Sequence, residues 1–329
     1  MTDLGIPGLR AAVEIGRGAS SIVYRAEQPK LGRTVAVKVL TAGPADDATR
    51  RRFSRECRAL GALSGHANIV TLYDGDWPEG GAPYLLMTHL SRGSLEDRLR
   101  RDGPLPWWEA AEIGVKLAGA LEAAHRMGVL HCDVKPSNVL ISDFGEPQLA
   151  DFGIAQIAEP HAAPARSAQA SGTPLYAPPE AFDGTAPAPA RDVYSLAATI
   201  HALIAGRPPV RIERAADLDE LVAQLRQTPP ADLRPLGVPE QLARALERAL
   251  AKAPEHRPQT ATLFAESLRH ALAAEQRSTA AWSPPAPAGP PSGSTPAWGG
   301  DDESPTVVVA TPRGGPPAAP AWADAGDAP

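Results

Sequence analysis

The chain has few cysteines and no long apolar run, and both shortages limit the classes of protein to which it can belong. Two of its 329 residues are cysteine, which fits a reducing compartment, and no Cys/His group has the spacing of a zinc site. No stretch approaches the roughly 18–20 apolar residues that cross a bilayer, and the first residues lack the charged-then-apolar pattern of a signal peptide. The net charge of −6 argues against nucleic acid as a main partner. We therefore expect a cytoplasmic protein without a membrane span.

Core-forming residues are scarce in the last part of the chain. From residue 276 to residue 329 there are 12 Pro and 7 Gly among 54 residues, which exceeds the roughly 25–30% typical of low-complexity segments. Alanine fills much of the rest, so this segment has too little apolar volume for a core of its own. We expect a disordered tail over residues 276–329.

Two short motifs in the middle of the chain combine carboxylate, amide and lysine side chains. Residues 131–138 read His-Cys-Asp-Val-Lys-Pro-Ser-Asn, and residues 151–153 read Asp-Phe-Gly. Their spacing resembles the active site of eukaryotic-like protein kinases. The resemblance implies Asp133 as the base or orienting carboxylate and Lys135 as the cation beside the transferred phosphoryl group of ATP. It implies Asn138 and Asp151 as ligands of Mg²⁺, with Mn²⁺ as the alternative.

The tripeptide Asp-Phe-Gly occurs twice, starting at Asp143 and at Asp151. The apolar run 139–141 and the run 148–150 can pair as antiparallel strands, with a glycine-containing turn between them. The first copy would then lie at the tip of a hairpin, and the second would return beside the catalytic motif. We therefore expect Asp151 to be the metal ligand and Asp143 to be a solvated turn residue.

A glycine-containing segment and the strand after it resemble the ATP-binding part of the same family. Gly16 and Gly18 lack a Cβ, so backbone N–H groups there can approach phosphate oxygens, and Ser21 replaces the third glycine of the family pattern. Alternation along residues 34–40 places Ala36 and Lys38 on one face. By resemblance, Lys38 holds the α- and β-phosphates; an ordinary hairpin and a solvated lysine are the alternatives. The resemblance also implies nucleotide contacts from Ile15, Gly16, Gly18, Val23, Ala36, Met87 and Leu90, the last two at the hinge.

The periodicity of residues 46–63 predicts a helix with Phe53, Cys57 and Leu60 on its buried face. Glu56 lies beside this face. We expect Glu56 to form the ion pair that holds Lys38 in the nucleotide site.

Further motifs resemble the second half of the family. Residues 172–180 resemble the segment that binds the acceptor peptide, and Lys135 together with Thr173 matches the serine/threonine group. The resemblance implies an ion pair between Glu180 and Arg257. It also implies that Asp192, which opens an apolar helix, supports the catalytic loop from below.

Cys132 is a departure from the family, which usually has arginine before the catalytic aspartate. That arginine normally binds a phosphorylated residue of the activation loop. Ser167 and Ser171 are the only hydroxyl side chains between residues 154 and 171, so we expect activity that does not depend on their phosphorylation. A redox role for Cys132 and plain packing are the alternatives, and packing is favoured.

We therefore predict an α+β, bilobal protein kinase fold. A small five-stranded antiparallel lobe with one main helix would span residues 8–90, and a mostly helical lobe would span residues 91–275. The resemblance is to actinobacterial serine/threonine kinases, which implies ATP and protein substrates as partners and autophosphorylation as an activity. A pseudokinase scaffold is the alternative, disfavoured because Lys38, Asp133, Asn138 and Asp151 are all present.

The tail contains one patterned stretch, an acidic run at residues 301–303 followed by Thr306 and three valines. It resembles ligands of forkhead-associated domains, which read phosphothreonine. An ordinary linker is the alternative.

Overall fold

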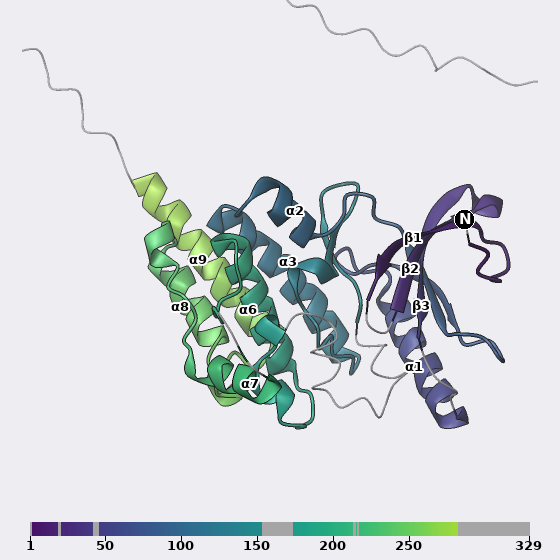
Figure 1. Cartoon of the computed structure of the whole chain (residues 1–329). Coiled ribbons are helices and arrows are strands. Elements are labelled where there is room, and N and C mark those ends of the chain that lie inside the picture. The colour runs from purple at the N-terminus through teal and green to yellow at the C-terminus, as the bar shows by residue number, and fades with distance from the viewer. Residues whose placement is uncertain are drawn as a thin grey trace, which may run out of the picture. The chain divides into compact units, whose positions relative to one another are not determined.

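A computed structural model describes residues 2–18, 21–41, 46–152, 174–212, 215 and 217–281, with side chains up to residue 274. Residues 1–282 form one compact unit, which consists of a sheet-containing N-terminal lobe and a helical C-terminal lobe (Figure 1). The predicted α+β, bilobal fold is therefore confirmed. Ser167, Ser171, Thr173 and Thr306 lie outside the described residues.

The N-terminal lobe is an antiparallel sheet with the strand order β1-β2-β3-β5-β4. Its outer face is covered by the N-terminal segment, where Leu4, Ile6 and Leu9 pack on a small core that includes Val35 and Val37. These β-branched valines are typical of a buried strand. The five strands are β1 (Arg10–Arg17), β2 (Ser21–Gln28), β3 (Arg33–Leu40), β4 (Leu72–Asp76) and β5 (Tyr84–Thr88).

One helix of this lobe, α1 (Asp47–Leu63), packs beside the sheet. Asp46 caps it by accepting a hydrogen bond from the backbone N–H of Thr49 at 2.8 Å, which satisfies a donor that has no partner within the helix. Phe53, Cys57 and Leu60 are buried, so the predicted buried face is confirmed.

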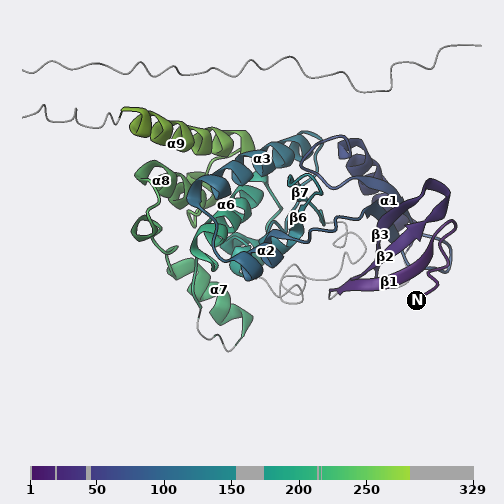
Figure 2. The ribbon, with the colours of Figure 1, turned by 90° about the horizontal axis from the view of Figure 1, so that it is seen from above.

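The C-terminal lobe is built around α6, whose side chains from Ala190 to Ile204 are all buried. A helix that is buried on every side belongs at the centre of a lobe, and α3 lies beside both α6 and α9 (Figure 2). The helix begins at Pro189, earlier than the predicted Asp192, because proline is well suited to the first helical position. It ends at Ala205, and Gly206 caps it with a left-handed φ of 72°. The helices are α2 (Leu95–Asp102), α3 (Trp107–Arg126), α6 (Pro189–Ala205), α7 (Leu218–Gln227), α8 (Glu240–Ala249) and α9 (Ala261–Ala281).

Short 3₁₀ turns and one small sheet complete the described chain. The turns are Pro29–Leu31, Pro136–Asn138, Pro174–Tyr176, Pro179–Phe182, Arg234–Leu236 and Pro254–His256. Strands β6 (Val139–Ile141) and β7 (Pro147–Leu149) pair antiparallel. Helix α9 continues past residue 276, where the composition changes. None of the described helices has the length and apolarity needed to cross a membrane.

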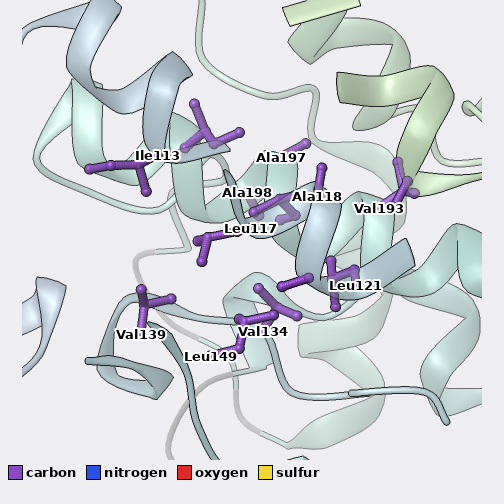
Figure 3. Packing of buried hydrophobic residues seen from close by; sticks show 14 of the residues in the cluster. Ile113, Leu117, Ala118, Leu121, Val134, Val139, Leu149, Val193, Ala197 and Ala198 are labelled. Atoms are coloured by element: carbon purple, nitrogen blue, oxygen red, sulfur yellow. The ribbon is translucent and has the colours of Figure 1, made fainter. Parts of the chain in front are cut away.

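The core of the helical lobe continues beneath the catalytic motif. Figure 3 shows Val134, Val139 and Leu149 gathered around Leu117 and Leu121 of α3, and all five side chains are buried in one cluster. Apolar packing therefore fixes the backbone on both sides of the residues expected to be catalytic.

Candidate active site

Asp133 is held by two neighbours from its own loop. Its Oδ2 accepts a hydrogen bond from Asn138 Nδ2 at 2.9 Å and lies 2.9 Å from Lys135 Nζ. Its side chain is 39% exposed, whereas that of Lys135 is 8% exposed. Oδ1 has no partner among the described residues. The arrangement leaves one carboxylate oxygen free to accept a proton from a hydroxyl group.

The backbone of the same loop is held from below by Asp192. Its two oxygens accept hydrogen bonds from the N–H groups of Cys132 at 2.8 Å and His131 at 2.9 Å. Oδ2 is also 2.8 Å from His125 Nε2. Cys132 has φ of 63°, a left-handed conformation that costs about 1–2 kcal/mol for a residue with a Cβ. Asp192 therefore supports the catalytic loop as expected, and it stabilises a strained residue.

The two copies of Asp-Phe-Gly have different environments. Phe144 is 95% exposed at the tip of the β6–β7 hairpin, and Phe152 is 7% exposed in the core. Asp143 is exposed and accepts a hydrogen bond from Ser91 Oγ at 3.0 Å. After β7, the N–H of Ala150 donates to the carbonyl of Asn138 at 2.9 Å. The hairpin thus brings Asp151 back beside the catalytic loop, as the sequence predicted.

Lys38 forms an ion pair with Asp151, with Nζ and Oδ1 2.8 Å apart. Burial by itself raises the pKa of Asp151, but the ammonium of Lys38 lowers it, and the net pKa lies below the usual value. The predicted partner, Glu56, forms no ion pair among the described residues, so that prediction is wrong for this structure. The helix face was predicted correctly, but Glu56 lies at its half-buried edge, and Asp151 binds Lys38 instead.

A small cavity of about 30 Å³ lies between Lys38, Asp151 and the inner face of α1. It is otherwise lined by apolar side chains, including Leu60, Met87 and Phe152. This volume exceeds the roughly 10–15 Å³ that one water molecule needs. Lys38 and Asp151 therefore meet at the edge of a cavity with mostly apolar walls.

The strand register places the expected nucleotide-binding residues on one face of the sheet. Val23 is paired with Lys38, and Ala36 is paired with Met87. Cross-strand partners and alternate residues of a strand point to the same side. Ile15, at 50% exposure, belongs to the neighbouring β1. The remaining expected contacts are Gly16, which pairs with Val23, Gly18, whose N–H donates to Ser21 O at 2.8 Å, and Leu90 after β5.

The oxygen atoms of Asn138 and Asp151 fit a hard divalent cation. Asn138 donates hydrogen bonds from its Nδ2 to Asp133, so its side-chain amide oxygen remains available as a metal ligand. Asp151 Oδ2 has no partner among the described residues. Oxygen donors of this kind suit Mg²⁺ and Mn²⁺.

The buried ion pair expected in the second lobe is present. Arg257 is 2% exposed, and its Nη1 and Nη2 bind the carboxylate of Glu180 at 2.6 and 2.9 Å. A bidentate ion pair of this kind fixes the relative orientation of the two side chains as well as neutralising their charges.

The thiol of Cys132 is unsuited to redox chemistry. Burial raises the pKa of this thiol to about 12, and the nearby carboxylate of Asp192 adds to the effect. A thiol that remains protonated is a poor nucleophile. The packing role is therefore favoured.

Sequence reasoning missed two side chains next to these motifs. His125 contacts Asp192, and Arg191 binds the backbone at Glu180 and Thr185. The presence of a charged residue beside the apolar run of α6 could have indicated a structural role for Arg191. The sequence contained no comparable signal for His125.

A model of the protein kinase domain matches residues 9–271. The chain belongs to the protein kinase domain family. The match covers both lobes and all the candidate catalytic residues discussed above.

Two relatives with named functions are actinobacterial kinases. The chain is 49% identical over 259 residues to serine/threonine-protein kinase PknK of Mycobacterium bovis, covering 78% of this chain and 23% of PknK. It is 36% identical over 254 residues to serine/threonine-protein kinase PknB of Mycobacterium leprae, covering 75% of this chain and 40% of PknB. The chain thus spans less than half the length of these relatives.

Solved kinase structures share the fold. The PknI kinase domain of Mycobacterium tuberculosis superposes with a TM-score of 0.63 at 29% identity, covering 83% of this chain and 100% of that domain. Rad53 residues 1–466, in complex with AMP-PNP, superposes with a TM-score of 0.64 at 23% identity, covering 80% of this chain and 65% of that one.

Proposed function

We propose that this protein transfers the γ-phosphoryl group of ATP to serine or threonine hydroxyl groups of proteins, including its own. The observation that carries the proposal is the grouping of Asp133, Lys135 and Asn138 with the returning Asp151 and with Lys38. These are the carboxylate, cation and oxygen ligands that phosphoryl transfer needs. The relatives' names, serine/threonine-protein kinase, support the acceptor class.

In this proposal Asp133 orients the acceptor hydroxyl through its free Oδ1 and takes its proton. Lys135, whose ammonium lies 2.9 Å from Oδ2, places positive charge beside the same carboxylate and the transferred group. Both effects act on charge that develops during transfer rather than on nucleotide binding.

Lys38 would bind the α- and β-phosphates from β3, and the face with Val23, Ala36 and Met87 would cover the adenine. Asn138 and Asp151 would hold the divalent cation, which neutralises phosphate charge when bound. Asp151 would then exchange its contact with Lys38 for the cation. The AMP-PNP bound to Rad53 supports ATP as the nucleotide.

The domain boundaries, the location and the further partner also belong to this proposal. Residues 8–275 would form the catalytic unit, and residues 276–329 a tail whose first residues, up to Ala281, continue α9. Free Cys57 and Cys132 support a reducing, cytoplasmic location. The acidic run before Thr306 supports a forkhead-associated partner.

The test compares Asp133→Asn with the wild-type chain, using ATP, Mg²⁺ and myelin basic protein as acceptor. We expect kcat to fall by about 10²–10⁴-fold, while ATP affinity changes little, because the carboxylate acts on the transition state. Equal turnover by the two proteins would indicate a contaminating kinase and would remove the support for the proposal.

The duplicated tripeptide offers a matched pair of variants. Asp151→Asn should abolish transfer, because it removes a metal ligand and the partner of Lys38. Asp143→Asn should leave turnover within about twofold of wild type, because exposed polar groups contribute little. The reverse result would show that the wrong copy has been assigned.

A further inference from the structure

Arg191 is a nearly buried arginine in the first turn of α6, with an exposure of 9%. Its Nη2 donates to the carbonyl of Thr185 at 2.6 Å, to Thr185 Oγ1 at 2.5 Å and to the carbonyl of Glu180 at 3.2 Å. Thr185 Oγ1 also donates to the Glu180 carbonyl at 3.2 Å. The Arg191 guanidinium thus forms hydrogen bonds with both ends of segment 180–185.

The partners of Arg191 are neutral. Among the described residues no carboxylate forms an ion pair with it, although burying a guanidinium is costly unless acceptors replace its water. Here the acceptors are two backbone carbonyls and a hydroxyl group. They reach Nη2 together only while segment 180–185 keeps its present conformation. The charge therefore stabilises that conformation.

Arg191 and Asp192 are neighbours that hold different parts of the site. Asp192 accepts from the N–H groups of His131 and Cys132 in the catalytic loop. Arg191 holds segment 180–185, which follows the turn Pro174–Tyr176. The first turn of α6 thus joins the loop that carries Asp133 to segment 180–185, which continues directly from the segment 172–180 expected to seat the acceptor.

Arg191 also lies near the position where this chain lacks the usual arginine. Burial raises the pKa of the Cys132 thiol, and the positive charge of Arg191 partly opposes that effect. Arg191 also adjoins Asp192, whose carboxylate accepts a hydrogen bond from the N–H of Cys132 at 2.8 Å. This arginine comes from α6 rather than from the catalytic loop.

We propose that Arg191 is a positioning residue for the protein acceptor: it holds segment 180–185 at a fixed place relative to Asp133. The inference rests on the proposed kinase activity. Removing Arg191 would loosen the C-terminal end of the expected acceptor segment, at Glu180, and leave the nucleotide side intact, because Lys38, Val23 and Ala36 lie on the other lobe.

The experiment measures two reactions of the full chain: transfer to myelin basic protein, and ATP hydrolysis without acceptor. Arg191→Gln should raise the KM for the acceptor about tenfold, which corresponds to about 1.4 kcal/mol. The KM for ATP and the hydrolysis rate should stay within about twofold. Arg191→Lys should have an acceptor KM between those of wild type and Arg191→Gln, because lysine keeps the positive charge but lacks the planar, multi-donor guanidinium group. Thr185→Val, which removes one acceptor, should raise the acceptor KM about threefold.

Arg226→Gln is the matched control, because Arg226 of α7 forms an exposed ion pair with Asp183 in the same segment. Exposed pairs contribute little, so the acceptor KM should stay within about twofold of wild type.

Three outcomes would overturn the inference. In the first, Arg191→Gln has a wild-type acceptor KM. In the second, Arg191→Gln loses ATP hydrolysis and phosphoryl transfer in parallel, as the loss of a merely structural residue would cause. The third applies if Arg191→Gln does not fold: Thr185→Val then has an unchanged KM for the acceptor. Wild-type protein that transfers no phosphate would instead refute the kinase proposal, and the inference with it.

Discussion

Asp192→Asn is expected to weaken both the stability and the turnover of this protein. The carboxylate accepts from two backbone N–H groups and lies against His125 Nε2, whereas an asparagine has one acceptor oxygen and an NH₂ group. At least one N–H of the catalytic loop would therefore face another donor. A buried donor left unpaired costs about 1–3 kcal/mol, and the remaining bonds lose their charge-assisted strength. We expect the free energy of unfolding to fall by about 2–4 kcal/mol.

The effect on turnover follows from the conformation of Cys132. Its φ of 63° is held by the hydrogen bond from its N–H to Asp192 at 2.8 Å. Without that bond the backbone can relax and move the adjacent Asp133. A displacement of about 1 Å costs on the order of 10²-fold in rate. We expect kcat to fall by about that factor, with little change in the KM for ATP.

Urea unfolding and steady-state kinetics measure the two effects, with Asp219→Asn at an exposed position of α7 as the control. In a Cys132→Gly background the kcat loss from Asp192→Asn should be smaller, because glycine adopts a positive φ without strain. An Asp192→Asn protein that keeps kcat within about threefold of wild type would refute this reasoning.

The stability effect should also depend on pH. Burial alone would raise the pKa of Asp192, but the hydrogen bond with His125 and the neighbouring groups bring it below its usual value. A depressed folded pKa gives stability that is present above the unfolded pKa of about 3.9 and is lost as the pH falls through the folded value. The difference between wild type and Asp192→Asn should therefore shrink in acid.

Three further outcomes are expected. Gly114→Ala should lower the free energy of unfolding by about 1–3 kcal/mol, because its Cβ would overlap Ile200 of α6; Gly119→Ala, with open space around it, should be neutral or stabilising in the same urea titration. Lys252→Met should be more stable than wild type, since the buried Nζ has no hydrogen-bond partner among the described residues. Burial and the charge of a neighbouring arginine lower the Lys252 pKa to about 8, so melting curves should show the largest gain below pH 8 and a shrinking gain up to pH 10.5. Cys132→Ser should keep its activity, and intact-mass measurements should show slow alkylation of Cys132 at neutral pH, because its thiol is protonated there.

The sequence predicted best where local rules decide the structure. Turn chemistry around Gly145 was enough to separate Asp143 from Asp151, because an antiparallel return fixes where each copy lies. The buried face of α1 followed in the same way from the spacing of Phe53 and Leu60.

Side-chain partners set by distant segments could not be predicted in this way. Lys38 lies on β3, and its partner depends on how α1 and the segment after β7 approach the strand. Spacing within α1 shows which face is buried but not how far Glu56 reaches. The bonds of Arg191 likewise depend on a loop six to eleven residues earlier in the chain.

The β6–β7 hairpin has a consequence for any search that identifies sites from short sequence patterns. Deleting residues 143–150 would join Ser142 directly to Asp151 and leave one intact Asp-Phe-Gly downstream of an intact residue 131–138 motif. Such a shortened chain would match the same patterns as the present one. It would lack the return strand, however, and its aspartate would lie where Asp143 lies now, beside Ser91 rather than Lys38. The tripeptide is a property of the sequence, but the position of its aspartate beside Lys38 depends on the path of the chain. A pattern that omits the returning strand will accept deletions that lose this position.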